Sequence, residues 1–454
     1  MLKSVNPVTG KIVETYEAHS DKGVEKIINA TDKSWQHWRT TSFEQRSALM
    51  QNISILLKSR KEELARLMAL EMGKVMKEGI AEIEKCAWVC EYYAQNAESM
   101  LENETIETQY SRSFVSYQPL GTILAVMPWN FPFWQVFRFL APTLMAGNTA
   151  VLKHASNVPG CAMAIEELFR EAGFPENVFR TLLVGSKLVE NVIRHPAIKA
   201  VSLTGSTPAG RSVAAIAGSE LKKCVLELGG SDPYIILKDA ELEKSAKTCA
   251  AGRLLNAGQS CIGAKRFIVV DEIYFEFLEY FTDEMNQAVF GDPFHPETTM
   301  GPLARKDLRD ELHQQVVNSV KSGAEIVLGG EIPNRKGAFY PPTILENVKP
   351  GMLAYDEELF GPVASVIRVK DEAEAIKVAN DTEFGLGAAV FTRDLKKGEH
   401  IAEKQLEAGC CFVNDFVKSD PRLPFGGIKT SGYGRELSTQ GIKEFMNVKT
   451  VVVK

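Results

Sequence analysis

The sequence predicts an α/β protein with two or more domains, each built on a parallel sheet covered by helices. Its 454 residues exceed what one ordinary hydrophobic core accommodates. From residue 121 to about 228, short apolar runs with strand character alternate with segments of helical periodicity. This is the pattern of a parallel, helix-covered sheet. The alternation repeats between residues 234 and 413 and indicates a second domain of the same class.

The N-terminal part differs from this alternation. A turn at 6–10 precedes a short strand, and apolar residues recur at helical spacing over 43–72 and over 75–101. This spacing predicts two long helices. Residues 113–117 alternate between polar and apolar types, as in one strand of a protruding hairpin.

Within the first α/β domain, helical segments connect successive apolar strands. The expected strands are 121–128, 149–153, 178–184, 200–204 and 223–228, and the expected helices are 132–146, 159–172, 187–194 and one from residue 207. The chain ends in an apolar strand at 449–454 that has no hairpin partner nearby. Such terminal strands often pair with the sheet edge of another subunit.

The composition argues against several classes of protein. The net charge of −6 and the lack of a basic block disfavour nucleic acid or an anionic membrane as partner. No run reaches the roughly 18 apolar residues of a membrane-spanning helix, and the N-terminus lacks the apolar core of a signal peptide. The eight cysteines and seven histidines have neither disulfide-framework nor metal-binding spacing. We therefore expect no metal site and a cytoplasmic protein.

Cys261 stands in the stretch around which the rest of the chain is organised. It lies between small and flexible residues, after an amphipathic stretch at 246–255 and before the apolar run 267–270. This pattern predicts a helix, a sharp loop that carries the thiol, and a buried strand. Gly258 and Gly263 permit close backbone approach and favour a nucleophile over the alternative of a buried structural cysteine.

Two further motifs could bind a nucleotide. Gly205 and Ser206 follow a strand and open a helix, so that free backbone N–H groups would face an anion, although the spacing is not GxGxxG. The alternative is an ordinary turn between a strand and a helix. Lys153 ends a strand at the edge where open parallel sheets bind nucleotides, and the alternative there is a solvated lysine.

Two polar residues at strand ends suit acyl chemistry. Glu227 ends an apolar strand before two glycines and could act as a general base, and the alternative is a salt-bridged or capping glutamate. Asn130 follows a buried strand and could donate a hydrogen bond to an oxyanion, with a turn-forming asparagine as the alternative. No GxSxG motif supports a serine hydrolase.

Taken together, these segments resemble the NAD(P)-dependent aldehyde dehydrogenase superfamily, in the family's order and over nearly the whole chain. The matching motifs are Asn-Pro-Val-Thr-Gly at 6–10, Pro-Trp-Asn-Phe-Pro at 128–132, Lys153, Thr-Gly-Ser at 204–206, Glu-Leu-Gly-Gly at 227–230, Gly-Gln-Ser-Cys at 258–261, Glu-Glu-Leu-Phe-Gly-Pro-Val at 357–363, Pro-Phe-Gly-Gly-Ile-Lys at 424–429, Ser431-Gly432 and Gly-Arg-Glu at 434–436.

The resemblance implies a role for each matching residue. Cys261 is the expected nucleophile, the Asn130 amide and the Cys261 N–H the expected oxyanion donors, and Glu227 the base that activates water. The retained Glu227 favours hydrolysis to a free acid over transfer to coenzyme A. The expected cofactor-binding residues are Trp129 in the cleft, Lys153 at the adenosine ribose, Gly205 and Ser206 at the pyrophosphate, and Glu358 with Phe360 at the nicotinamide ribose.

The cofactor choice depends on the position three residues after the lysine. Many NAD-preferring relatives carry a glutamate there that would repel a 2′-phosphate, whereas this chain has Ser156. Either NAD or NADP is therefore expected to serve.

The substrate class depends on Arg138 and Ser419, which match residues that hold the substrate carboxylate in succinate semialdehyde dehydrogenases. The chain as a whole is most similar to the bacterial members of that group. The alternative is that Arg138 pairs with a structural acid. A departure is Leu255, where many of those relatives place a second arginine.

Three functional hypotheses follow. The first is oxidation of succinate semialdehyde to succinate, and the second is oxidation of an uncharged or aromatic aldehyde. The third is a non-catalytic member that only binds nucleotide. The second hypothesis is motivated by Leu255 and by the apolar residues Phe131, Phe133, Trp134, Phe137 and Phe416.

The resemblance also implies an architecture of two doubly wound, Rossmann-like domains and a small β element for oligomerisation. The cofactor-binding domain would comprise 1–107 and 120–226, and the catalytic domain 227–443. The oligomerisation element would combine 108–119 with 444–454, giving a homodimer or homotetramer.

Overall fold

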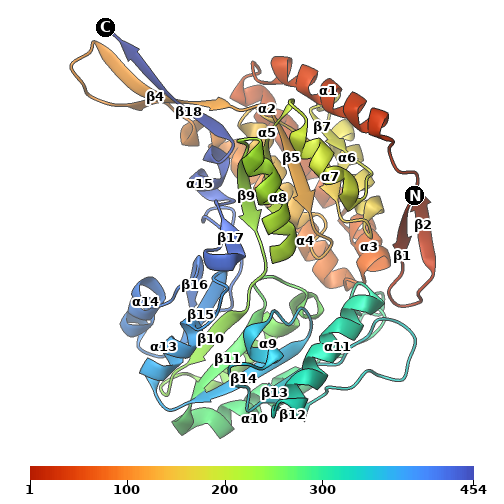
Figure 1. Cartoon of the computed structure of the whole chain (residues 1–454), viewed down its shortest axis with the longest axis vertical. Helices are drawn as coiled ribbons and strands as arrows, with labels where there is room; N and C mark the ends of the chain where they lie inside the picture. The colour runs from red at the N-terminus through yellow and green to blue at the C-terminus, as the bar shows by residue number, and fades with distance from the viewer.

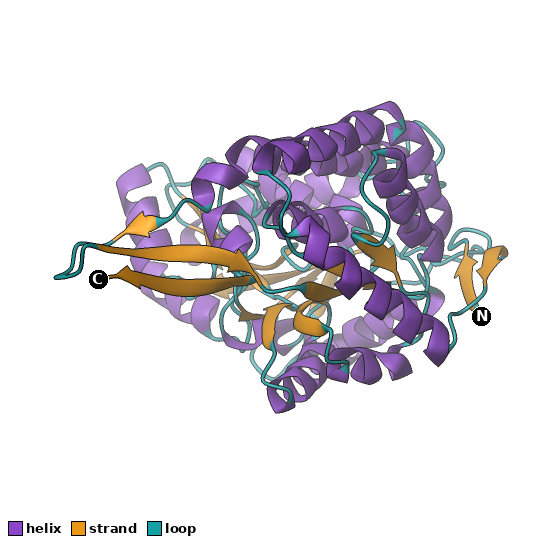
Figure 2. Ribbon diagram, turned by 90° about the horizontal axis from the view of Figure 1, so that it is seen from above, coloured by secondary structure: helices purple, strands orange, loops and turns teal.

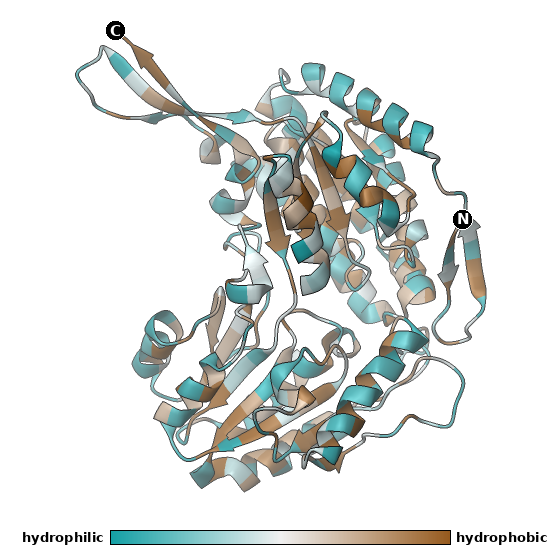
Figure 3. Ribbon diagram, in the orientation of Figure 1, coloured by the Kyte–Doolittle hydropathy of each residue, from teal (hydrophilic) through white to brown (hydrophobic).

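A computed structural model describes residues 1–454 and has two α/β domains with a β arm that projects from the first (Figure 1). The first domain is built on a six-stranded sheet and the second on a seven-stranded sheet. The predicted α/β fold class with parallel sheets is confirmed. In Figure 3 the strands are mostly apolar, whereas the helices carry polar stripes, as expected for sheets buried between helices.

The first sheet has the order β17-β9-β8-β5-β6-β7, and all neighbours are parallel except β17 and β9. Its order reverses between β5 and β8, and open α/β sheets bind ligands at the carboxyl ends of strands at such a switch point. The strands are β5 (Thr122–Met127), β6 (Thr149–His154), β7 (Phe179–Thr181), β8 (Ile198–Thr204), β9 (Lys223–Glu227) and β17 (Gly432–Tyr433).

Helices cover this sheet and form an N-terminal layer beside it. They are α1 (Asp21–Trp38), α2 (Phe43–Ser59), α3 (Lys61–Met72), α4 (Met76–Met100), α5 (Trp134–Met145), α6 (Pro159–Glu171), η1 (Ser186–Leu188), α7 (Val189–Arg194) and α8 (Thr207–Ser219). The expected helix 43–72 is interrupted at Arg60, which leaves helical geometry with φ −105° and ψ 12°. Both halves bury apolar residues, so the apolar periodicity does not reveal the break.

The second sheet has the order β12-β13-β14-β11-β10-β15-β16, and only the edge strand β12 is antiparallel. Its strands are β10 (Asp232–Ile236), β11 (Ala264–Val270), β12 (Glu325–Leu328), β13 (Thr343–Glu346), β14 (Val363–Val369), β15 (Gly387–Phe391) and β16 (Cys410–Val413). Its helices are α9 (Leu242–Leu254), η2 (Leu255–Gly258), η3 (Asp271–Ile273), α10 (Tyr274–Asn286), α11 (Lys306–Lys321), α12 (Leu353–Asp356), α13 (Glu372–Asn380) and α14 (Leu395–Lys404).

The chain returns to the first domain before its C-terminus. After η4 (Lys429–Ser431), strand β17 joins the first sheet, and α15 (Ser438–Lys443) follows. Phe425, Leu437 and Phe445 belong to the apolar core of the first domain. The last part of the expected catalytic domain 227–443 therefore packs with the first domain, because β17 joins the first sheet and the residues around it pack in the first core.

The projecting arm is a three-stranded sheet of β3 (Glu104–Thr105), β4 (Arg112–Pro119) and β18 (Met446–Val453). Strand β18 pairs antiparallel with β4 from Met446 opposite Pro119 to Val453 opposite Arg112. The two segments expected in one element thus lie together, and the partner of the terminal strand is β4 of the same chain. Figure 2 shows the arm on the side opposite the N-terminal hairpin of β1 (Leu2–Val5) and β2 (Ile12–Tyr16). None of the helices is long and apolar enough to cross a membrane.

Candidate active site

All of the predicted catalytic and cofactor-binding residues line two cavities at the carboxyl edge of the first sheet. The smaller cavity, of about 290 Å³, is lined by Asn130, Gly205, Ser206, Glu227, Cys261, Glu358 and Phe360. The larger cavity, of about 1080 Å³, is lined by Lys153 and Ser156. Trp129 lines both, so the two cavities adjoin. They lie beyond β5, β6, β8 and β9, where the strand order predicts a ligand site.

The loop that carries Cys261 is held in an unusual backbone conformation. Asn256 and Ala257 have φ values of 56° and 54°, in the left-handed region that is costly for residues other than glycine. Gly258 approaches the backbone of Gly361 so closely that a side-chain Cβ would overlap its carbonyl group. The expected close approach of the backbone is therefore found at Gly258, where it packs against the backbone of Gly361.

Asn130 is tied directly to this loop. Its side-chain Nδ2 donates a hydrogen bond to the Gln259 carbonyl over 3.1 Å, while its own backbone carbonyl accepts from the Asn256 amide over 2.7 Å. The same carbonyl accepts a hydrogen bond from Lys74 over 3.0 Å, and Lys74 forms a buried ion pair with Glu82. The candidate oxyanion donor and the thiol therefore lie on backbone segments that fix each other.

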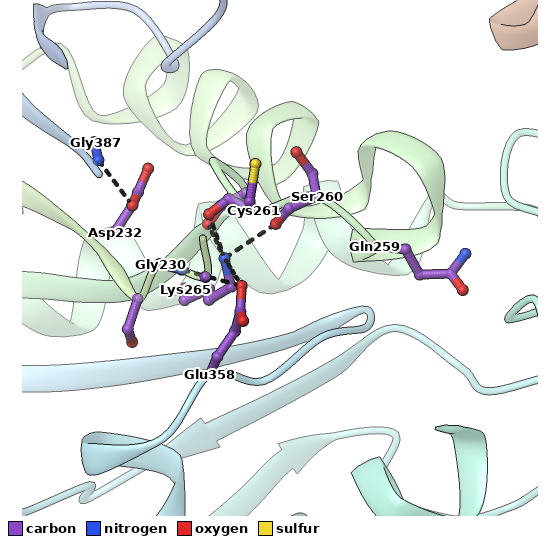
Figure 4. Close-up of polar contacts among 12 residues, drawn as sticks. Gly230, Asp232, Gln259, Ser260, Cys261, Lys265, Glu358 and Gly387 are labelled. Carbon is purple, nitrogen blue, oxygen red and sulfur yellow. Dashed lines mark hydrogen bonds and ion pairs between the residues drawn. The ribbon is translucent and has the colours of Figure 1, made fainter. Parts of the chain in front are cut away.

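Lys265 is a residue of the site that the sequence interpretation missed. Its ammonium donates to the backbone carbonyls of Ser260 and Cys261 over 3.0 Å each and of Gly263 over 3.2 Å. It also lies 3.5 Å from Oε1 of Glu358 (Figure 4). The sequence offered one signal for Lys265: a lysine at the start of an apolar strand is expected to be buried and therefore to have polar partners.

Burial controls the protonation of the two reactive groups. Desolvation raises the pKa of the Cys261 thiol to about 12, although the positive charges of Arg138 and Lys265 oppose this shift. Desolvation also raises the pKa of Glu227 well above its ordinary value, and neither of its carboxylate oxygens has a hydrogen-bond partner. Without bound substrate and cofactor, burial therefore favours the neutral form of both groups.

The cofactor cleft offers groups that suit a dinucleotide. Ser206 is the N-cap residue of α8, but its hydroxyl makes no capping bond, so it and the first N–H groups of the helix are free for an anion. Trp129 and Phe360 both line the smaller cavity and contact each other edge to face, with ring centroids 5.8 Å apart. A free helix N-terminus and exposed aromatic rings are chemically suited to the phosphates and rings of a dinucleotide.

The match to known proteins extends over the whole chain. A model of the aldehyde dehydrogenase family matches residues 1–451. The chain belongs to the aldehyde dehydrogenase family. The predicted family and enzyme class, an NAD(P)-dependent aldehyde dehydrogenase, are therefore confirmed.

Several relatives are similar along their full length. A Synechocystis protein with the name "probable succinate-semialdehyde dehydrogenase (NADP+)" is 48% identical over 450 residues, which cover 99% of each chain. Succinate-semialdehyde dehydrogenase (NADP+) 1 of Mycobacterium tuberculosis is 47% identical over 453 residues, again 99% of each chain. The crystal structure of succinic semialdehyde dehydrogenase from Streptococcus pyogenes with NADP+ superposes with a TM-score of 0.98, at 38% identity and 100% coverage of both chains.

In this aldehyde dehydrogenase, Arg138 pairs with an acid of the protein. Its Nε forms a close ion pair with Glu436, its terminal nitrogen donates to the Thr204 hydroxyl over 3.3 Å, and its guanidinium lies over the Phe425 ring. The alternative expectation for Arg138, a pairing with a structural acid, is therefore met. The positive field of Arg138 nevertheless reaches Cys261, where it opposes the rise in pKa. A direct contact of Arg138 with substrate stays a prediction.

Ser419 lies on the loop after β16 and is almost completely buried. Its hydroxyl accepts a hydrogen bond from the ammonium of Lys85 on α4 over 2.8 Å. Neither Arg138 nor Ser419 lines the two cavities. No cluster of three or more histidine, cysteine or acidic side chains has the arrangement of a metal site.

Proposed function

We propose that this enzyme oxidises succinate semialdehyde to succinate and prefers NADP as cofactor. The observation that carries the chemistry is the convergence of the Cys261 thiol, the Asn130 amide and the Glu227 carboxyl on one cavity beside the cofactor cleft. The substrate is supported by the names of relatives that are 47–48% identical over 99% of the chain.

The first step is attack of the Cys261 sulfur on the aldehyde carbon. A carbon–sulfur bond forms, the electron pair of the carbonyl π bond moves to the oxygen, and the thiol proton passes to solvent water. The resulting oxyanion accepts hydrogen bonds from the Asn130 amide and from the Cys261 N–H, donors that the rigid loop holds in advance. Because the thiol has a raised pKa, proton loss has to accompany substrate and cofactor binding.

The second half of the reaction releases the acid. The bound cofactor supplies the acceptor for the hydride that leaves the former aldehyde carbon. Glu227 then accepts a proton from water as the water oxygen attacks the thioester on Cys261. Burial raises the pKa of this carboxyl and so strengthens its ionised form as a proton acceptor. The carbon–sulfur bond breaks, the sulfur takes up the proton that Glu227 had accepted, and the free acid, the thiol and the Glu227 carboxylate are restored.

The preference for NADP is supported by the charge around the larger cavity. Ser156 lines this cavity beside Lys153 and carries no charge to repel a phosphate. The basic lining residues outnumber the acidic ones: they are Lys3, Lys153, Arg305, Lys306, Arg309, Arg335 and Lys336, against Asp307. Such a field favours the additional phosphate of NADP.

Oxidation of an uncharged aldehyde is the second candidate function. This function is favoured because Arg138, the cation expected to bind a substrate carboxylate, already forms an ion pair with Glu436. Leu255, at the start of η2, adds no charge in its place.

We also propose a homodimer or homotetramer that assembles through the β arm. Strand β18 forms an open edge of its sheet and exposes Val448, Val452 and Val453. An apolar open edge of this kind is suited to contact with a second subunit. A cytoplasmic location is supported by the cysteines, all eight of which are free.

The decisive experiment compares kcat/KM for succinate semialdehyde with kcat/KM for butanal, using NAD and NADP in parallel. A charged contact to the substrate carboxylate predicts a ratio on the order of tens to hundreds. The variant Cys261→Ala serves as the blank for non-enzymatic oxidation. A ratio near one would reject succinate semialdehyde and favour an uncharged substrate.

A further inference from the structure

The second sheet has a switch point of its own, which the active site does not use. Strand β10 is followed by β11 on one side, whereas β14 is followed by β15 on the other side of β10, so the order reverses between β10 and β15. Open parallel sheets bind ligands at the carboxyl ends of the strands at such a point. Cys261 precedes β11 and therefore lies at the amino end of this sheet. The carboxyl edge is left to a different ligand.

A cavity of about 380 Å³ lies at this carboxyl edge. One side of it is the start of α9, where Glu241, Lys244, Ser245 and Thr248 line the cavity. Their spacing of three and four residues places these side chains on one face of the helix. The remaining lining residues follow or end β15 and β16, and they include Arg393. The volume lies within the range of roughly 300 to 1,000 Å³ that is usual for sites of small organic ligands.

Hydrogen bonds between three loops fix the wall that carries Arg393. Asp239, after β10, accepts from the Thr392 hydroxyl over 2.8 Å and from the backbone N–H groups of Arg393 and Asp394 over 3.2 Å each. Asn414, after β16, accepts from the Thr392 N–H over 2.9 Å and donates to the Thr392 carbonyl over 2.8 Å. The backbone of this wall is therefore ordered before a ligand arrives, which lowers the entropic cost of binding.

Three polar groups of the lining lack a firm partner within the chain. The guanidinium of Arg393 is exposed and forms no hydrogen bond or ion pair, since only the backbone N–H of this residue binds Asp239. The ammonium of Lys244 has only Glu241 beside it, at 4.0 Å, and both side chains are largely exposed. Ser245 is only 4% exposed, yet its hydroxyl makes no hydrogen bond within the chain. Because buried hydroxyl groups normally have a partner, this one is available to a ligand.

We propose that this cavity binds a small organic phosphate, at a site separate from the cofactor cleft. At neutral pH a phosphate monoester has a charge of about −2, which matches the two cations Lys244 and Arg393, whereas a single carboxylate would match only one of them. A guanidinium can also bind two phosphate oxygens at once, and the Ser245 hydroxyl can donate to a phosphate oxygen. Phe391 and the exposed Leu395 line the same cavity and offer apolar surface to the carbon skeleton of the ligand.

The test measures binding of glycerol 3-phosphate by isothermal titration calorimetry, with NADP at saturating concentration so that the cofactor cleft is filled. We expect one binding event per chain. The double variant Lys244→Met/Arg393→Met should lose about tenfold or more in affinity, and Ser245→Ala about three- to tenfold. Lys247→Met is the matched control, since Lys247 is exposed on the same helix but does not line the cavity. Both replaced cations are exposed, and thermal unfolding checks that each variant is folded.

Glycerate, a hydroxy acid with the same number of carbon atoms, is the matched ligand without phosphate, and it should bind at least about tenfold more weakly. Equal affinity for glycerate would overturn the assignment to a phosphate. Absence of binding by the wild type, or undiminished binding by the double variant, would overturn the site itself. Binding seen only when NADP is omitted would place the phosphate in the cofactor cleft and overturn the proposal as well. None of these outcomes depends on which aldehyde the enzyme oxidises.

Discussion

Arg138 and Glu436 form a buried ion pair that joins α5, the helix after Asn130, to the returning C-terminal segment. Their side chains are only 2% and 5% exposed. Glu436 also accepts a hydrogen bond from Ser202 of β8 over 3.2 Å, and its backbone forms a bridge with Phe425. The pair therefore holds α5, β8 and the return segment in one arrangement around Glu227. The charge of Arg138 lowers the pKa of Glu227, and the charge of Glu436 raises it.

The first prediction concerns the stability contributed by this pair. Arg138→Met or Glu436→Gln alone leaves a buried charged or polar partner unsatisfied and should cost about 3–5 kcal/mol. The double variant removes both partners and should be less destabilised than the sum of the single variants. Thermal and urea unfolding of the wild type, the two single variants and the double variant gives the four free energies of unfolding of this double-mutant cycle. Additive effects would mean that the two residues do not act as a pair.

The second prediction concerns the thiol. Because burial raises the pKa of Cys261 to about 12, the thiolate fraction should increase about tenfold per pH unit between roughly pH 7 and 10. The rate of inactivation of the cofactor-free enzyme by iodoacetamide should follow this increase. Peptide mapping confirms that Cys261 is the alkylated residue. A plateau near pH 8 would contradict the prediction, since it would indicate a thiol activated before cofactor binds.

Several residues that line the two cavities could be predicted as neighbours because they lie in local motifs at the ends of strands. Asn130, Lys153, Ser206 and Glu227 follow or end apolar strands, and parallel strands bring their carboxyl ends to one edge. The strand periodicity and the motifs together therefore predict that these residues line a common site, without knowledge of tertiary contacts.

Contacts between distant segments could not be predicted in this way. The partner of Arg138 is Glu436, and the partner of Ser419 is Lys85 on a helix near the N-terminus. Lys85 has the helical spacing of the residues around it, so its sequence context is that of an ordinary partly solvated lysine. The break at Arg60 and the return of Phe445 to the first core likewise depend on packing that no local pattern encodes.

The third prediction concerns Glu227 as the base for hydrolysis. Glu227→Gln keeps the shape of the side chain but cannot accept a proton, so attack by Cys261 should proceed and acid release should fail. Steady-state kcat should fall on the order of 100- to 10,000-fold. Rapid mixing should still give a burst of reduced cofactor that approaches one per active site. Loss of the burst would assign Glu227 to the first step instead, and Cys261→Ala, which gives no burst, is the control.

The fourth prediction concerns the choice of cofactor. Ser156 lines the larger cavity beside Lys153, where the 2′-phosphate of NADP would meet the basic residues. Ser156→Glu introduces a carboxylate that repels this phosphate and can accept a hydrogen bond from the ribose hydroxyl of NAD. We expect kcat/KM with NADP to fall on the order of 100-fold and kcat/KM with NAD to change less than about threefold. Ser156→Ala, which adds no charge, should keep the NADP preference within about tenfold of the wild type. Equal losses with both cofactors would mean that Ser156 serves the structure of the loop. No loss with either would mean that the phosphate binds farther along the cavity, beside Arg335 and Lys336.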